Sequence, residues 1–98
     1  MDFIVVLAKI QPKEGCQDSI LELSEELIFE TLQEEGNIDY QLLKSNEDDS
    51  LTFVEKWESP EALKKHMASP HFLNFHDESG EFVESNNIQV LKASEVKF

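Results

Sequence analysis

The residues best suited to acid–base chemistry lie close together in the middle of the chain. Glu55 and Trp57 are two positions apart, and His66 and His71 follow soon after. An imidazole has an unperturbed pKa of about 6.5 and exchanges protons at neutral pH. A carboxyl group that is buried among aromatic side chains acquires a raised pKa. His66 is therefore the candidate base or proton relay, with Glu55 as a second candidate acid–base group.

Each of these residues also has a structural interpretation, and the sequence leaves the alternatives open. His66 could instead be a core histidine that holds its helix on a sheet. Trp57 could stack on an aromatic substrate or belong to the core. Glu55 could be a structural hydrogen-bond partner. Tyr40, the only tyrosine, could donate to a substrate oxygen, and Phe72 could line a cavity, but both are also ordinary core residues.

The three histidines are spaced at steps of five, at His66, His71 and His76. On one helix a step of five residues turns the side chain by about 140°, so the three rings would not converge. Pro70 also interrupts the run. The spacing therefore predicts no zinc or iron site from these three histidines.

The charge of the chain argues against nucleic acids as partners. The 98 residues carry a formal net charge of −13, and all eight basic residues are lysines. Phosphate contacts need a positive surface, which this composition does not supply. A single cysteine, Cys16, fits a reducing compartment, and the apolar run over 3–7 is too short for a signal peptide or a membrane span. We expect a cytoplasmic protein with no membrane partner.

The hydrophobic pattern predicts four strands and three helices. Strands are expected over 3–10, 37–45, 51–57 and 88–96, and one helix over 16–35 with Gly36 ending it. In the second strand, Ile38, Tyr40 and Leu42 are expected on one face. Ser59-Pro60 and Ser69-Pro70 are helix starts, each with a hydroxyl residue before proline. The last helix is expected to continue through Phe82 until Asn86 ends it.

The order β-α-β-β-α-α-β predicts an α+β fold of the ferredoxin-like type, with one antiparallel sheet in a single domain over 1–98. Helices cover only one face of such a sheet. The strands over 3–10 and 51–57 are nevertheless apolar on both faces. A second copy of the sheet would cover the other face, so we expect a homodimer.

Four short motifs resemble the antibiotic biosynthesis monooxygenase (ABM) family. A strand ends in Glu55-Lys56-Trp57, a short helix then reaches His66, and Ser69-Pro70-His71-Phe72 follows as a small-Pro-His-apolar step. Glu34-Glu35-Gly36-Asn37 matches ahead of the second strand. The resemblance covers nearly the whole chain and is greatest for the quinol monooxygenase and autoinducer-2-degrading branches. The motifs are specific for the fold and the family, but not for a substrate.

The resemblance implies a dimeric α/β barrel with an apolar cavity between sheet and helices in each protomer. It also implies oxidation of a small aromatic, phenolic or quinol substrate by dioxygen, without metal or flavin. His66 would be the catalytic base. The small-molecule substrate would be bound by Trp57, Glu55, Tyr40, Phe72 and His71.

Two other functions fit the same motifs: an autoinducer-2-type enzyme that processes a small carbonyl compound, and a dimeric small-molecule-binding module without activity. Haem degradation is not expected. Haem-degrading relatives carry an axial histidine where His76 stands, which matches, but they also carry an asparagine near the end of the first strand and an aromatic residue at the position of His66, and residues 4–7 contain no asparagine. The cavity should discriminate: an oxygenase needs an apolar pocket that reaches His66 and Trp57, a carbonyl enzyme a smaller and more polar one, and a structural protein a filled interior.

Overall fold

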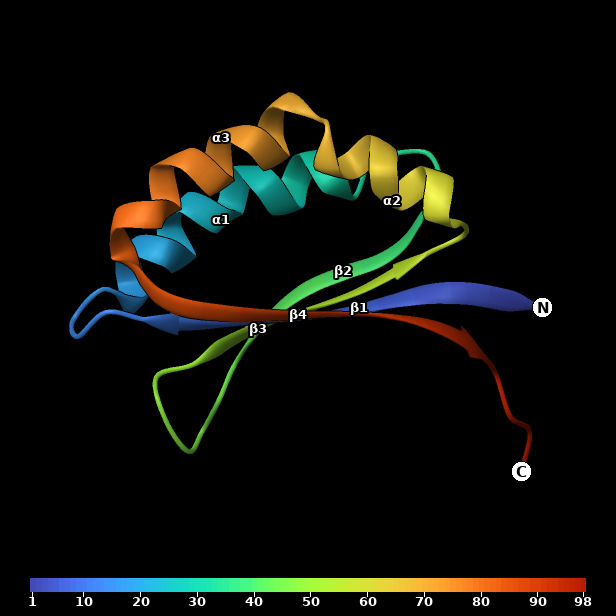
Figure 1. The fold of residues 1–98 in the computed structure, drawn as a ribbon, viewed down its shortest axis with the longest axis horizontal. Coiled ribbons are helices and arrows are strands. Elements are labelled where there is room, and N and C mark those ends of the chain that lie inside the picture. Colours follow the sequence, from blue (N-terminus) through green and yellow to red (C-terminus); the bar gives the residue numbers. More distant parts are fainter.

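The fold consists of a four-stranded antiparallel sheet with helices on one face, and the computed structural model describes all 98 residues (Figure 1). The strands lie in the order β2-β3-β1-β4. This confirms the predicted ferredoxin-like α+β architecture. The elements are β1 (Asp2–Pro12), α1 (Gln17–Thr31), β2 (Asn37–Lys44), β3 (Leu51–Trp57), α2 (Pro60–Met67), α3 (Pro70–Ser79), a 3₁₀ turn (Gly80–Phe82) and β4 (Val83–Ser94).

Strict alternation along β1 and β3 separates an inner from an outer face of the sheet. Val6 pairs with Glu55 and Ile4 with Trp57, and all four side chains are buried beneath the helices. Successive strand residues point to opposite faces, so these pairs define the inner face. The core is completed from α1, whose Ile20 and Leu27 lie on its sheet-facing side.

The two serine–proline steps begin helices as predicted. The hydroxyl of Ser59 accepts a hydrogen bond from the Ala62 backbone N–H, and that of Ser69 accepts one from the Phe72 N–H. Each serine thereby satisfies a backbone donor of the first turn that has no partner in the helix. The chain changes direction between α2 and α3. The end of α2 and the start of α3 therefore both lie near the end of α1 (Figure 1).

Three predictions about the elements were wrong: where the last helix gives way to β4, which face Ile38 occupies, and where α1 ends. The last helix ends at Ser79, and β4 begins at Val83 rather than at residue 88. Phe82 shows helical spacing, but its carbonyl accepts from the Lys13 N–H at 2.8 Å, so the long first strand draws this segment into the sheet. Ile38 is 52% exposed because a register shift between Asn37 and Asp39 moves it off the face of Tyr40.

The third wrong prediction is the end of α1, which lies at Thr31 instead of residue 35. Residues 32–36 form a turn in which the Glu34 N–H donates to the Thr31 carbonyl at 3.0 Å. Gly36 has a φ of +88°, which reverses the chain toward β2. Glu34 therefore lies in a turn beside α2, not on the exposed side of a helix.

The outer face of the sheet carries apolar side chains that no helix covers. Figure 1 views the sheet edge-on, with all the helices on one side of it. Val5, Leu7 and Val54 on the outer face are half-buried, and Leu91, which pairs with Val5, is 44% exposed. None of the helices combines the length and hydropathy needed to cross a lipid bilayer.

Candidate active site

An apolar cavity of about 140 Å³ lies between the sheet and the helices α2 and α3. Thirteen of its 19 lining residues are hydrophobic, and the volume corresponds to about five water molecules in the liquid. Ile88 and Val90 on β4 line it and are 57% and 56% exposed, so the cavity opens beside this edge strand. Its inner walls include Val6, Tyr40, Phe53, Leu63, Phe72 and Phe75.

His66 stands in the wall of this cavity and is almost completely buried, at 1% exposure. Aromatic rings surround its imidazole: the ring centroid of Trp57 lies at 4.7 Å, that of Phe72 at 5.1 Å and that of Tyr40 at 5.3 Å. Its Nδ1 lies 3.0 Å from the Glu34 carboxylate, whereas its buried Nε2 has no hydrogen-bond partner in the protein. The Nε2 atom is therefore the ring nitrogen available to a molecule in the cavity.

Burial lowers the pKa of His66, although the hydrogen bond and the charge of Glu34 act in the opposite direction. Desolvation disfavours the charged imidazolium, so the ring is neutral at neutral pH. A neutral ring has one nitrogen that can accept a proton. These properties are those of a general base that faces an apolar pocket.

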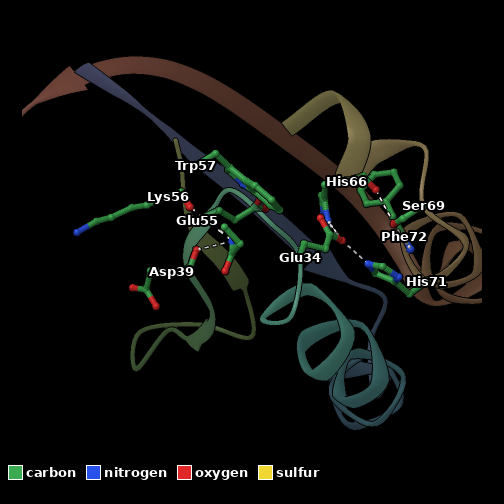
Figure 2. Close-up of polar contacts among 10 residues, drawn as sticks. Glu34, Asp39, Glu55, Lys56, Trp57, His66, Ser69, His71 and Phe72 are labelled. Carbon is green, nitrogen blue, oxygen red and sulfur yellow. Dashed lines mark hydrogen bonds and ion pairs between the residues drawn. The ribbon is translucent and has the colours of Figure 1, made fainter. Parts of the chain in front are cut away.

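Glu34 contacts two histidines at once, a role that the sequence analysis did not predict. Its Oε1 is hydrogen-bonded to His66 Nδ1 and also to His71 Nε2 (Figure 2). Glu34 and His71 are about one-sixth exposed, at 17% and 16%. The available signal was the Glu34-Glu35-Gly36-Asn37 motif. It marked the position of Glu34, but it did not reveal the contact with His66, which lies 32 residues later in the chain.

The expectation that helical steps keep the histidines apart fails for His66 and His71, because the chain reorients at Ser69 between two helices. The ligand atoms of Glu34, His66 and His71 lie within 4.8 Å of one another. Two imidazoles and a carboxylate are a donor set that zinc or iron(II) accepts. Here, however, both ring nitrogens contact the carboxylate oxygen itself, as in a hydrogen-bonded cluster. His76 lies outside the cluster, in the cavity wall.

Glu55 and Trp57 form a buried pair on β3. The Trp57 Nε1–H donates to Glu55 Oε1 at 3.0 Å (Figure 2), and Glu55 lines the cavity at 5% exposure. Burial raises the pKa of the Glu55 carboxyl to about 7, opposed by the Trp57 hydrogen bond and assisted by the nearby charge of Glu34. Trp57 is fully buried and does not line the cavity, so it supports Glu55 and His66 from behind.

The remaining predicted site residues divide between the cavity and its surroundings. Tyr40 and Phe72 line the cavity, and burial raises the pKa of the Tyr40 hydroxyl far above its usual range, so it stays a donor. His71 does not line the cavity; it lies beyond Glu34, in a groove between α1 and α3. The sequence analysis did not identify four further wall residues, Ser79 at the end of α3 and Asn86, Ile88 and Val90 on β4. The alternation of Asn86, Ile88 and Val90 along β4 was missed in part because the predicted strand began only at residue 88.

The raised pKa of Glu55 makes the stability of the protein depend on pH. The folded protein holds the proton with a pKa of about 7, against 4.5 for an ordinary glutamate. The protonated form therefore stabilises the fold fully below about pH 4.5, and this contribution is lost as the pH rises through about 7. Between these limits the free energy of unfolding of the wild type should fall by about 3 kcal/mol because of Glu55, and we expect Glu55→Gln to lack this fall. Urea unfolding of both proteins at several pH values measures this, and parallel pH dependences would contradict it.

Comparison with known proteins agrees with the fold and the motifs. Residues 3–78 match the profile of the antibiotic biosynthesis monooxygenase family. "Putative monooxygenase Rv0793" of Mycobacterium tuberculosis is 30% identical over 80 residues, covering 82% of this chain and 79% of its own. "Putative monooxygenase YcnE" of Bacillus subtilis is 33% identical over 73 residues, covering 74% and 77%.

A solved structure extends the likeness to the whole fold. The crystal structure of a conserved protein from Methanosarcina mazei Go1 superimposes with a TM-score of 0.89 at 33% identity, over 93% of this chain and 92% of that one. The match of the family profile over residues 3–78 confirms the resemblance carried by the Glu-x-Trp and Ser-Pro-His motifs. The chain belongs to the antibiotic biosynthesis monooxygenase family.

Proposed function

We propose that this protein is a cofactor-independent monooxygenase that oxidises a small aromatic, phenolic or quinol substrate with dioxygen. The observation that carries the proposal is the buried Nε2 of His66, which has no protein partner and belongs to a residue in the wall of an apolar cavity. A cavity of about 140 Å³ suits one aromatic ring, since an apolar cavity of about 150 Å³ binds benzene, and its opening beside β4 leaves room for a second fused ring.

In the proposed reaction, His66 Nε2 accepts the proton of a substrate hydroxyl, which leaves an electron-rich phenolate and an imidazolium. The phenolate gives one electron to dioxygen, and the resulting substrate radical and superoxide combine with a proton at a ring carbon to form a hydroperoxide. The O–O bond then breaks as the carbon loses its hydrogen, giving a carbonyl group and one water. Naphthoquinol and dioxygen thus yield hydroxynaphthoquinone and water, and the substrate supplies all the electrons.

The cavity walls support this chemistry in two ways. Apolar side chains exclude water from the anion and its radical, which limits side reactions. Tyr40 and Glu55 supply two of the polar groups in the wall, where they orient substrate oxygens. The mostly apolar lining favours a flat aromatic substrate over the small carbonyl compound of the alternative enzyme, for which a smaller and more polar pocket is expected.

We also propose that the protein works as a homodimer through the outer face of its sheet. Leu91 is 44% exposed there, beside half-buried Val5 and Leu7. A second copy would remove this apolar surface from water. The wild type should therefore run at twice the 11.3 kDa of one chain. We expect Leu91→Glu to shift it to the monomer mass in light scattering, because the charge would be buried without a partner.

A matched variant separates this effect from a general loss of solubility. Phe29 on α1 is 65% exposed, on the helical side of the molecule, so Phe29→Glu should leave the mass unchanged. A monomeric wild type, or a dimer that Leu91→Glu leaves intact, would exclude the outer face as the interface.

Oxygen uptake by metal- and flavin-free protein with naphthoquinol tests the proposed activity. Because quinols autoxidise, the protein must raise the rate well above that of the same solution with a heat-denatured sample. A saturable excess that scales with protein concentration is expected. A rate equal to autoxidation would reject this substrate class and favour the carbonyl-processing or binding alternatives.

A further inference from the structure

We propose that Glu34 and His71 are positioning residues that hold His66 in one tautomer, with its proton on Nδ1 and a bare Nε2 toward the cavity. The inference rests on the proposed function for the use of that Nε2 as a base. The tautomer itself can be observed whether or not the protein turns over a substrate.

The tautomer follows from the chemistry of the partner. An ionised carboxylate only accepts hydrogen bonds, so the His66 Nδ1 that lies 3.0 Å from Glu34 Oε1 must carry the proton. A neutral imidazole has one N–H, so Nε2 then presents a lone pair. The hydrogen bond at one ring nitrogen thereby determines the state of the other.

The ring is held in the orientation that this tautomer needs. His66 is 1% exposed, and Trp57, Phe72 and Tyr40 surround it with ring centroids within 5.3 Å. Turning the ring over would remove Nδ1 from Glu34 and require these aromatic neighbours to move. The carboxylate also stabilises the imidazolium that forms when Nε2 accepts a proton, as the carboxylate of a catalytic triad does.

His71 supplies the second contact that keeps Glu34 in place. Glu34 lies in the turn after α1 and is partly exposed, so one hydrogen bond would leave its side chain free to rotate toward water. His71, from the first turn of α3, hydrogen-bonds to the same Oε1 from the opposite side (Figure 2). The carboxylate is thus anchored between two helices, while His71 itself borders the groove that contains Glu22, Glu26 and Glu78.

Several other titratable groups border His66 or its cavity and must be considered in any pH measurement. They are Lys9 on β1, Tyr40 on β2, Glu55 on β3, and His71 and His76 on α3, whereas α1, α2 and β4 contribute no other titratable side chain to the cavity wall. Only Glu34 contacts a nitrogen of the His66 ring. The test therefore relies on the site of the proton rather than on the pH profile alone.

Nitrogen NMR of ¹⁵N-labelled protein at neutral pH reads the tautomer directly. The wild type should show His66 protonated at Nδ1 and unprotonated at Nε2. Glu34→Ala should shift the proton to Nε2 or give a mixture, because no acceptor remains at Nδ1. Glu34→Gln should restore the wild-type tautomer, since its amide oxygen still accepts. Glu35→Ala removes an exposed acid of the same turn and should change nothing.

Kinetics with naphthoquinol give the second measurement. Glu34→Ala is expected to lower kcat by about 100-fold with little change in KM, because Glu34 acts through His66 and does not line the cavity. Glu34→Gln should recover the tautomer but only part of kcat, since it lacks the charge that stabilises the imidazolium. His71→Ala should lower kcat less than Glu34→Ala does.

Three results would overturn the proposal. They are a wild type with its proton on Nε2, a tautomer that survives Glu34→Ala in folded protein, and a stoichiometric transition metal on purified protein that this variant releases. The last would make Nδ1 a metal ligand in place of a donor. Because the wild-type tautomer is measured without substrate or variant, a misfolded variant or an inactive protein leaves the test intact.

Discussion

Replacing His66 with asparagine should lower kcat for quinol oxygenation by at least about 100-fold, with the protein still folded. The asparagine amide can take the place of Nδ1 and donate to Glu34, but the atom in the position of Nε2 is lost. The change therefore removes the proposed base while it preserves the polar contact that His66 makes behind the cavity. Steady-state oxygen uptake measures the effect, and circular dichroism with thermal unfolding verifies the fold.

The pH profile gives this variant a second signature. Burial lowers the pKa of His66, so the wild-type kcat/KM should fall only as the pH drops through a value below that of an ordinary histidine. His66→Asn should lack this acidic limb. Lys65→Asn, an exposed change on the same helix, controls for altered helix stability and should behave as wild type. A folded His66→Asn protein with nearly full activity would instead assign His66 to the core.

The second large effect concerns Gly36, whose substitution by alanine should destabilise the protein by about 3 kcal/mol. Part of this cost arises because φ is +88°, in the left-handed region that costs other residues roughly 1–2 kcal/mol. The rest is steric, since a Cβ at Gly36 would lie 2.6 Å from the Cβ of Ala62 on α2. Of a typical total stability of about 5–15 kcal/mol, such a loss is a large fraction.

Gly15 provides the matched control for this prediction. It has a φ of +77°, but a Cβ there would meet nothing within 4 Å. Gly15→Ala should therefore cost only the conformational part, about 1 kcal/mol. Urea unfolding of both variants separates the two terms. Equal losses would mean that α2 moves aside at Ala62, and the close contact between the turn and α2 would then not position Glu34.

Local signals predicted most of the fold. The serine–proline steps mark helix starts because capping is decided within four residues, and the alternation along β1 and β3 marks buried strands because one face must be apolar. The end of α3 could not be predicted in this way. Phe82 continues a helical spacing, but it ends a 3₁₀ turn, and the hydrogen bond of its carbonyl to the distant Lys13 N–H leads the chain into β4 at Val83.

The site was predictable in its chemistry but not in its connections. His66, Glu55, Tyr40 and Phe72 were identified by residue type and motif, and they line one cavity. Glu34 was not assigned a role, because the predicted helix over 16–35 included it in its last turn, whereas the chain leaves the helix at Thr31 and the turn at Gly36 brings Glu34 under α2. Trp57 was expected at the cavity wall, but sheet pairing with Ile4 places it behind Glu55 and His66.

Oxygen-isotope labelling tests the central claim most directly. Metal- and flavin-free protein is mixed with naphthoquinol under ¹⁸O₂, and the product is analysed at once by mass spectrometry. The proposed reaction predicts hydroxynaphthoquinone that carries one heavy oxygen atom, with one dioxygen consumed per product. Unlabelled naphthoquinone with hydrogen peroxide as the co-product would contradict it, because dioxygen would then only accept electrons and no oxygen atom would enter the substrate.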